Sequence, residues 1–187
     1  MEFNELKTEL ERIHVASFGW ALSCCQRDHA EAEDVLQSVY LKILDGKARY
    51  RGESNFKTWL FAVIRKTALS ERRANFRRAL RSMVGGSRLN ESARLPVAPG
   101  TLLEQAETQA QFLQALDKLP QRQREVLHLV FYEDLSLREA ATVMRVTIGS
   151  TRRHYDRGKK RLRELLEDEE GNYGVHWRRT ENPSAIL

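Results

Sequence analysis

The sequence predicts an all-α protein that consists of two small helical domains joined by a flexible linker. Apolar residues recur at helical spacing through most of the 187 residues. The 10 glycines and 4 prolines lie mostly outside these periodic stretches. One segment, Met83–Gly100, combines paired glycines and two prolines with no periodicity, which is typical of a linker. We therefore expect domains at residues 1–82 and 101–170, followed by a C-terminal tail at 171–187.

The first domain opens with two predicted helices. Apolar side chains follow helical spacing over residues 4–26, which predicts the first helix. The second helix is predicted from an N-cap at Asp28, with Glu31 as the acid of a capping box, to about Leu44. A glycine-containing turn follows at Asp45–Ser54.

A long third helix completes the first domain. Ser54 is its predicted N-cap, and the helix extends from Asn55 to about Ser82. Its first half is apolar and its second half is rich in arginine. The basic half is therefore available to an anionic partner.

Four helices are predicted in the second domain, at about 101–119, 120–132, 136–144 and 148–167. Capping boxes mark two of their starts. Thr101 pairs with Glu104 at the first start. Ser136 pairs with Glu139 at the third. Pro120 suits the first turn of the second helix, because no N–H is needed there.

The last two of these helices form a predicted helix-turn-helix, with its turn at Arg145–Thr147. Ala141 supplies the small residue that the crossing of the two helices needs. Such a motif presents the N-terminal half of its second helix to a DNA major groove. An ordinary helical hairpin with a basic face is the alternative. Four apolar side chains can bracket the turn and close the core: Met144, Val146, Leu137 and Leu162.

Charge is distributed unevenly around a total of +5. Residues 1–45 carry nine acids and four bases, a net charge of −5. Residues 56–82 carry eight bases and one acid (+7), and residues 147–163 carry seven bases and one acid (+6). Two separated basic helices suit two contacts with a polyanion, and the acidic N-terminal part suits a basic protein partner. Solvated helix faces are the alternative for each charge run.

The composition argues against membrane and secreted proteins. No apolar run approaches the roughly 20 residues that a membrane-spanning helix needs. The N-terminus MEFNELKTELER is acidic and helix-patterned, unlike a secretion signal. The two cysteines, Cys24 and Cys25, are adjacent, so they give no disulfide framework and suit a reducing cytosol. The sequence therefore predicts a cytoplasmic protein.

Neither catalysis nor metal binding is expected. The acidic residues form no paired-carboxylate site, and the sequence has no Gly-rich phosphate loop or Ser/His/Asp arrangement. Cys24 and Cys25 with His14 or His29 would suggest redox or metal sensing. However, adjacent residues of a helix point about 100° apart, which favours buried, neutral thiols. We expect no enzymatic activity, no cofactor and no metal.

Aromatic and basic residues are interleaved where the turn leads into the third helix. A protein that opens a duplex must hold unstacked bases, and aromatic rings beside cations do this by stacking and by neutralising the backbone. Phe56, Trp59 and Leu60 equally fit a core-facing stripe, and we expect Trp59 to pack in the core. The aromatic and basic candidates for contact with single-stranded DNA are Tyr50, Arg51, Lys57, Arg65, Lys66, Arg72 and Arg73.

The predicted second helix of the helix-turn-helix carries the candidate contacts to duplex DNA. Arginine can read guanine through two hydrogen bonds, whereas lysine is better suited to phosphates. The candidate residues are Thr147, Ser150, Thr151, Arg152, Arg153, Asp156, Arg157 and Lys160.

Several motifs occur together in one order: AED-x-x-Q at 32–37, RGES-x-F-x-TWL at 51–60, LDKLPQRQREVLHL at 116–129, and the helix-turn-helix. In these motifs, and over about residues 10–166, the chain resembles bacterial RNA polymerase sigma factors of the extracytoplasmic-function group. The resemblance implies two helical domains, region 2 and region 4, with a linker between them.

The resemblance also implies a function. The chain would bind core RNA polymerase and direct promoter-specific initiation, with catalysis left to the polymerase. Region 2 would melt the −10 element, with Glu53, Ser54 and Asn55 as further candidate contacts. The recognition helix of region 4 would read the −35 element. Region 4 would hold the β flap with its first helices, the linker would thread the polymerase cleft, and an anti-sigma factor is a common partner. The predicted second helix would dock on a β′ coiled coil through Asp34, Leu36, Gln37, Tyr40 and Leu41.

Three positions depart from the family pattern. Arg145 stands at the turn position that is usually Gly and needs a positive φ. Thr151 stands where Val is common, and Lys66 where many relatives carry Asn. The promoter sequence is therefore left open.

The alternative function is a helix-turn-helix regulator that binds duplex DNA without polymerase. The aromatic and basic stretch at 50–73 distinguishes a sigma factor from such a regulator, because a plain repressor does not melt DNA and does not need this stretch. The tail at 171–187 lies beyond the family core. It is either a disordered end or a regulatory appendage that docks through Tyr173 and Trp177.

Overall fold

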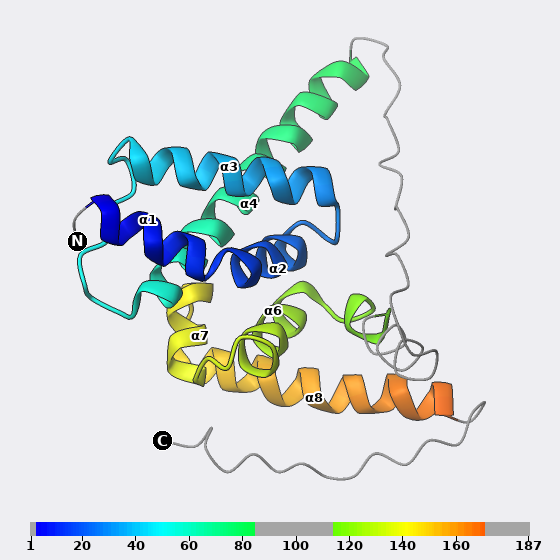
Figure 1. Cartoon of the computed structure of the whole chain (residues 1–187). Helices are drawn as coiled ribbons and strands as arrows, with labels where there is room; N and C mark the ends of the chain where they lie inside the picture. Colours follow the sequence, from blue (N-terminus) through cyan, green and yellow to red (C-terminus); the bar gives the residue numbers. More distant parts are fainter. Residues whose placement is uncertain (1–2, 85–113, 171–187) are drawn as a thin grey trace, which may run out of the picture. The chain divides into compact units, whose positions relative to one another are not determined.

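The structure, a computed structural model, describes residues 3–84 and 114–170 (Figure 1). Every regular element in these ranges is an α-helix, which confirms the all-α prediction for them. The chain divides into two compact units, Met1–Pro96 and Val97–Leu187. Most of the predicted linker, the start of the helix expected at 101–119 and the predicted tail lie outside the described residues.

The N-terminal unit begins with α1 (Phe3–Arg12) and α2 (His14–Cys24). The prediction of one helix over 4–26 was wrong, because the chain bends at Ile13, where φ is −107° and ψ is 14°. Ile13 is buried, so the bend turns its side chain, like Trp20 of α2, toward the core. The helix then ends at Cys24, before two residues with positive φ, Gln26 and Arg27.

The next helix, α3 (His29–Leu44), follows the prediction closely. Its N-cap is Asp28, whose carboxylate accepts a hydrogen bond from the Glu31 backbone N–H at 2.9 Å. This bond satisfies one of the free N–H groups of the first turn. The short side chain of Asp28 therefore fixes where the helix begins.

The long helix α4 (Phe56–Val84) ends close to the predicted residue but corrects the prediction of its N-cap. Asn55, rather than Ser54, accepts the capping hydrogen bond, from the Thr58 backbone N–H at 2.7 Å. Ser54 instead donates its hydroxyl to the Asn55 carbonyl oxygen at 3.2 Å. The C-terminal half of α4 extends beyond α2 and α3, so its arginines are in solvent (Figure 1).

Helices α2, α3 and α4 pack against one another and enclose the core of this unit. Trp20 is completely buried and stacks on Phe61 with the ring centroids 5.9 Å apart. Its Nε1–H donates to the Phe61 carbonyl oxygen at 3.0 Å. The buried indole therefore has a partner for its one polar group, which buried tryptophans usually need.

The C-terminal unit contains α6 (Gln121–Phe131), α7 (Leu137–Met144) and α8 (Ile148–Glu170), and residues 114–117 are also helical. Pro120 is the N-cap of α6 and not part of its first turn, because its ψ of 140° is extended. Gly158 lets α8 approach α6 closely, since a Cβ there would lie 3.2 Å from Leu127. The core cluster consists of Ala115, Leu116, Leu119, Leu127 and Leu162.

Helix α7 begins with a complete capping box, as predicted. The Ser136 hydroxyl accepts from the Glu139 backbone N–H at 3.3 Å, and the Glu139 carboxylate accepts from the Ser136 backbone N–H at 2.9 Å. Two backbone donors are thereby satisfied at the start of a helix of only 8 residues.

Ser136→Ala is expected to destabilise the C-terminal unit by about 1 kcal/mol, because alanine cannot accept from the Glu139 backbone N–H or donate to the Glu139 carboxylate, as the Ser136 hydroxyl does. Urea denaturation followed by circular dichroism measures the change. Ser70→Ala, at an exposed position inside α4, is the matched control and should cause no loss. Equal midpoints for Ser136→Ala and the wild type would contradict the capping role.

Candidate functional site

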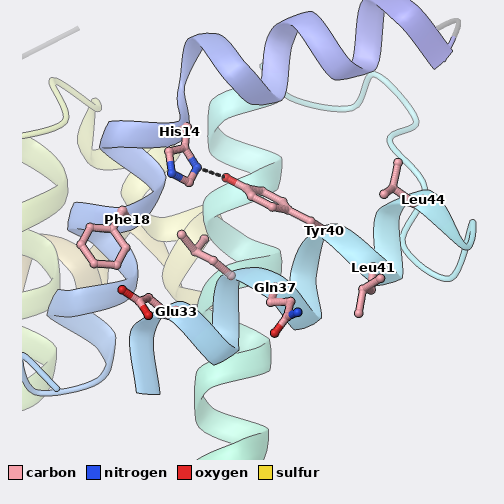
Figure 2. Close-up of a pocket in the computed structure, with 8 residues that line it drawn as sticks. His14, Phe18, Glu33, Gln37, Tyr40, Leu41 and Leu44 are labelled. Carbon is pink, nitrogen blue, oxygen red and sulfur yellow. Dashed lines mark hydrogen bonds between the residues drawn. The ribbon is translucent and has the colours of Figure 1, made fainter. Parts of the chain in front are cut away.

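A pocket of about 510 Å³ lies between α2 and α3 in the N-terminal unit (Figure 2). His14 and Tyr40 close one side of it, with His14 Nδ1 and the Tyr40 hydroxyl 2.9 Å apart. Burial raises the pKa of Tyr40, so its hydroxyl stays protonated at neutral pH. The pocket is lined by His14, Phe18, Glu33, Leu36, Gln37, Tyr40, Leu41 and Leu44.

Four of the five residues expected to bind polymerase line this pocket: Leu36, Gln37, Tyr40 and Leu41. Leu36 is only 4% exposed, so it forms the inner wall and cannot project toward a partner. Asp34 is exposed but is not among the lining residues. Sequence reasoning missed His14 and Phe18, because their contribution depends on how α2 packs against α3.

Two of the apolar side chains that line the pocket are exposed to solvent. Leu41 is 54% exposed and Leu44 is 52% exposed, both on α3. Val15, at the start of α2, is 84% exposed but is not among the residues that line the pocket. Exposed apolar side chains grouped around a pocket commonly mark a protein-binding surface.

The aromatic residues before and within the first turns of α4 pack on one another. The ring of Tyr50 lies 5.3 Å from that of Phe56 and 5.4 Å from that of Trp59, measured between centroids. The Tyr50 hydroxyl donates to the Ser54 carbonyl oxygen at 2.6 Å. This cluster packs the loop against α4. Trp59 contacts both other rings, but it is half-buried and is not one of the buried core residues that we expected it to join.

Around this cluster, the structure separates the candidate DNA contacts by exposure. Tyr50, Ser54 and Lys57 are half-buried. The Lys57 ammonium lies 5.4 Å from the centroid of the Phe61 ring. The exposed candidates are Arg51, Glu53, Asn55, Lys66, Arg72 and Arg73.

Arg65 is a correction, because its side chain is only 5% exposed and cannot reach DNA. It lies on the same face of α4 as Phe61 and Ala68, which are both buried. Its neighbour Lys66 is rotated about 100° around the helix and is exposed. A count of basic residues along the sequence does not distinguish these two faces.

The helix-turn-helix of α7 and α8 presents most of the predicted duplex contacts. Thr147 caps α8, with its hydroxyl accepting from the Ser150 backbone N–H at 3.2 Å. Thr151 is a second correction: it is completely buried, and its hydroxyl donates to the Thr147 carbonyl oxygen at 3.1 Å. It therefore packs against the rest of the unit instead of facing DNA. The exposed candidates are Thr147, Arg152, Arg153, Asp156, Arg157 and Lys160, with Ser150 half-buried.

A second exposed apolar area lies where α6 ends against α8. Phe131 is 52% exposed, and its ring stacks on Tyr155 with the centroids 5.9 Å apart. The Lys159 ammonium lies 4.3 Å from the centroid of the Tyr155 ring. Burial and the neighbouring charge of Asp156 raise the pKa of Tyr155, so this ring stays neutral. We call Phe131, Tyr132 and Tyr155 the α6–α8 patch.

The two cysteines are buried free thiols in the core of the N-terminal unit. Within residues 3–84 and 114–170, no three His, Cys, Asp or Glu side chains are grouped so that they could hold a metal ion. Burial raises the pKa of Cys25 to about 12. None of the helices in the same ranges combines the length and apolarity needed to cross a membrane.

Cys25 is expected to resist alkylation by iodoacetamide at pH 8 while the protein is folded. The thiolate is the reactive form, and at four units below the pKa only about one thiol in 10,000 is ionised. Mass spectrometry of the native chain and of the chain in urea measures the labelling. Rapid modification of Cys25 in the folded chain would contradict its burial.

Comparison with known proteins identifies both units. Residues 11–78 match the family described as Sigma-70 region 2, and residues 115–164 match Sigma-70, region 4. The chain is 30% identical over 144 residues to the ECF RNA polymerase sigma factor SigX of Bacillus subtilis, with 75% of this chain and 73% of SigX covered. It is 32% identical over 137 residues to the ECF RNA polymerase sigma factor EcfG of Rhodopseudomonas palustris, with 72% and 71% covered.

Two solved structures are also similar to this chain. The sigma factor RpoE of Bartonella quintana, determined in complex with the anti-sigma factor NepR, matches with a TM-score of 0.69 and 29% identity, over 87% of this chain and 97% of RpoE. CnrH in complex with the cytosolic domain of CnrY matches with a TM-score of 0.59 over 90% and 91%, but at 20% identity this likeness concerns the fold alone.

Proposed function

The chain belongs to the extracytoplasmic-function group of RNA polymerase sigma factors, and from this premise we propose how its surfaces divide the work of promoter recognition. As a sigma factor it binds core RNA polymerase and directs transcription from specific promoters. Catalysis belongs to the polymerase, and the sigma factor acts with it in the cytoplasm. Its own residues supply binding and specificity.

The pocket between α2 and α3 is the contact with the β′ coiled coil. The observation that carries this assignment is the pair of exposed leucines that line it, Leu41 and Leu44. Glu33 lines the same pocket, and Asp34 is exposed on the same helix. Apolar and acidic side chains together suit a helix that offers apolar and basic residues, as charge complementarity requires.

The loop before α4 and the outer face of α4 contact the −10 element. Arg51, Glu53 and Asn55 are exposed in the loop, and Tyr50 of the same loop packs on Phe56 of α4. The exposed cations of α4 follow along one helix: Lys66, Arg72 and Arg73. Cations in a row neutralise the phosphates of a melted strand while the loop holds an extruded base.

Helix α8 reads the −35 element with its N-terminal half. Arg152, Arg153 and Arg157 are exposed there, and an arginine can bind guanine through two hydrogen bonds. Lys160 lies further along the helix and suits a phosphate. The −35 contact therefore combines base reading near the turn with backbone binding further along.

The α6–α8 patch is the contact with the β flap. Phe131 and Tyr132 are 52% and 42% exposed at the end of α6, and Tyr155 of α8 continues the surface. Exposed aromatic side chains of this kind are frequent anchors of protein interfaces. An anti-sigma factor, such as the one bound to the RpoE relative, would inhibit the chain by covering this patch or the α2–α3 pocket.

A binding measurement tests the proposed function against the alternative of a regulator that acts without polymerase. Labelled full-length chain is titrated with purified core RNA polymerase, and complex formation is followed by fluorescence anisotropy. We expect a saturable one-to-one complex. A chain that ignores core polymerase but binds palindromic duplex DNA as a dimer would overturn the proposal in favour of the regulator.

A further inference from the structure

Arg145 occupies a backbone conformation that disfavours arginine. It is the C-cap of α7, with φ of 53° and ψ of 51°, in the left-handed region. Its backbone N–H donates to the Thr142 carbonyl oxygen at 3.3 Å, which closes the end of α7. Glycine adopts this conformation freely at helix ends, whereas a side chain with a Cβ is strained there. The turn therefore tolerates arginine at a cost in stability.

Nothing within the described part of the chain offsets this cost. The side chain of Arg145 is exposed, so it contributes little packing. Within residues 3–84 and 114–170, its guanidinium has neither a carboxylate at ion-pair distance nor a hydrogen-bond acceptor. A strained residue that stabilises nothing in its own unit points to a contact outside it.

The position of the turn indicates the chemistry of that contact. Arg145 lies three residues before Ile148, the first residue of α8, and so at the end of the helix that faces DNA. A second cation is close by: the Arg122 guanidinium of α6 donates to the Met144 carbonyl oxygen at 3.2 Å, next to the Arg145 backbone. One exposed arginine of the turn, Arg145, and one exposed arginine of α6, Arg122, thus lie at this end of the motif. Exposed arginines at the DNA-facing end of such a motif suit a phosphate.

We propose that Arg145 binds a phosphate of the −35 duplex, and that it stands at the glycine position of the turn because this contact strengthens DNA binding at the expense of stability. The proposal rests on the proposed function, since it requires α8 to enter the groove. It adds a DNA contact outside the recognition helix. It also gives a role to Arg145, which in the sequence is only a departure from the glycine that the family usually has at this turn.

Three variants of the full-length chain test the proposal. Arg145→Gly removes the charge and relieves the strained backbone. Arg145→Asn removes the charge with a residue that tolerates the left-handed region. Arg145→Lys keeps both the charge and the strain. Each is assembled with core RNA polymerase and titrated onto one promoter fragment that the wild-type holoenzyme binds, at several salt concentrations.

The two charge-removing variants are expected to bind roughly 3- to 10-fold more weakly, and the dependence of log K on log salt should become shallower by about 0.9, the value for one phosphate contact. Arg145→Lys should keep the wild-type slope. In thermal denaturation of the free chain, Arg145→Gly should melt a few degrees above wild type, whereas Arg145→Lys should not.

Two results would overturn the assignment. One is an unchanged salt slope for Arg145→Gly in a holoenzyme that otherwise binds, because no phosphate contact was then lost. The other is a lower melting temperature for Arg145→Gly, because the side chain would then stabilise its own unit. A wild-type holoenzyme that binds no promoter fragment would refute the proposed function itself, which separates that failure from the failure of Arg145.

Discussion

Replacing Leu41 with aspartate is expected to weaken the binding of this sigma factor to core RNA polymerase by about 10- to 100-fold. Leu41 lies at the rim of the α2–α3 pocket and is 54% exposed, so the fold depends on it little. In the complex, a carboxylate would be forced into an apolar contact, and the loss corresponds to about 1.4 kcal/mol for each factor of ten. Anisotropy titration with labelled chain measures the affinity.

Leu80→Asp is the matched control for this prediction. Leu80 is also 54% exposed and lies in the same unit, but on the projecting half of α4, away from the pocket. It should leave core binding within about twofold of wild type, and both variants should keep the wild-type melting temperature. If Leu80→Asp weakened binding as much as Leu41→Asp, a general effect of the added charge would replace the proposed surface. Changing Asp34 and Gln37 together should also reduce core binding.

Replacing Arg152 or Arg153 with alanine is expected to reduce promoter-dependent transcription by about 5- to 150-fold, the range for losing one good base contact. Both side chains are exposed at the N-terminal half of α8, where a recognition helix meets base edges. Core binding should not change, because the polymerase contacts lie elsewhere. Run-off transcription and anisotropy on the same preparations separate the two effects.

Arg163→Ala serves as the control for these two variants. Arg163 is an exposed arginine on the same helix, about ten residues further from the turn, so the change in net charge is identical. Its loss should reduce transcription only slightly. A loss of core binding in Arg152→Ala or Arg153→Ala would contradict the division between DNA-reading and polymerase-binding surfaces.

The sequence correctly predicted where a helix begins when only one nearby residue was a good N-cap. Asp28 and Ser136 cap α3 and α7 as expected, because a short polar side chain precedes each apolar run. The cap of α4 was misassigned to Ser54, since Ser54 and Asn55 are both good caps and sequence alone does not choose between them. The break between α1 and α2 at Ile13 could not be predicted from the sequence, because Ile13 continues the apolar spacing across both helices.

For the candidate site, the sequence predicted which types of residue take part better than it predicted which side chains face the solvent. Lys66 and Arg65 are both basic, but only Lys66 faces outward, because α4 packs its Arg65 face against the core. Thr151 is polar and is nevertheless completely buried, since its hydroxyl is satisfied within the first turn of α8. The pocket arises from the packing of α2 on α3, which brings Phe18 close to Glu33 (Figure 2). Such long-range proximity is not encoded in local spacing.

Run-off transcription with purified core RNA polymerase, with and without this chain, on a library of promoter fragments tests the central claim most directly. A sigma factor that reads both elements should produce specific transcripts only when the chain is present, and aligning the active fragments should reveal a −35 and a −10 element together. Transcripts that are the same with and without the chain, or a chain that binds duplex DNA yet neither binds core nor starts transcription, would contradict the account.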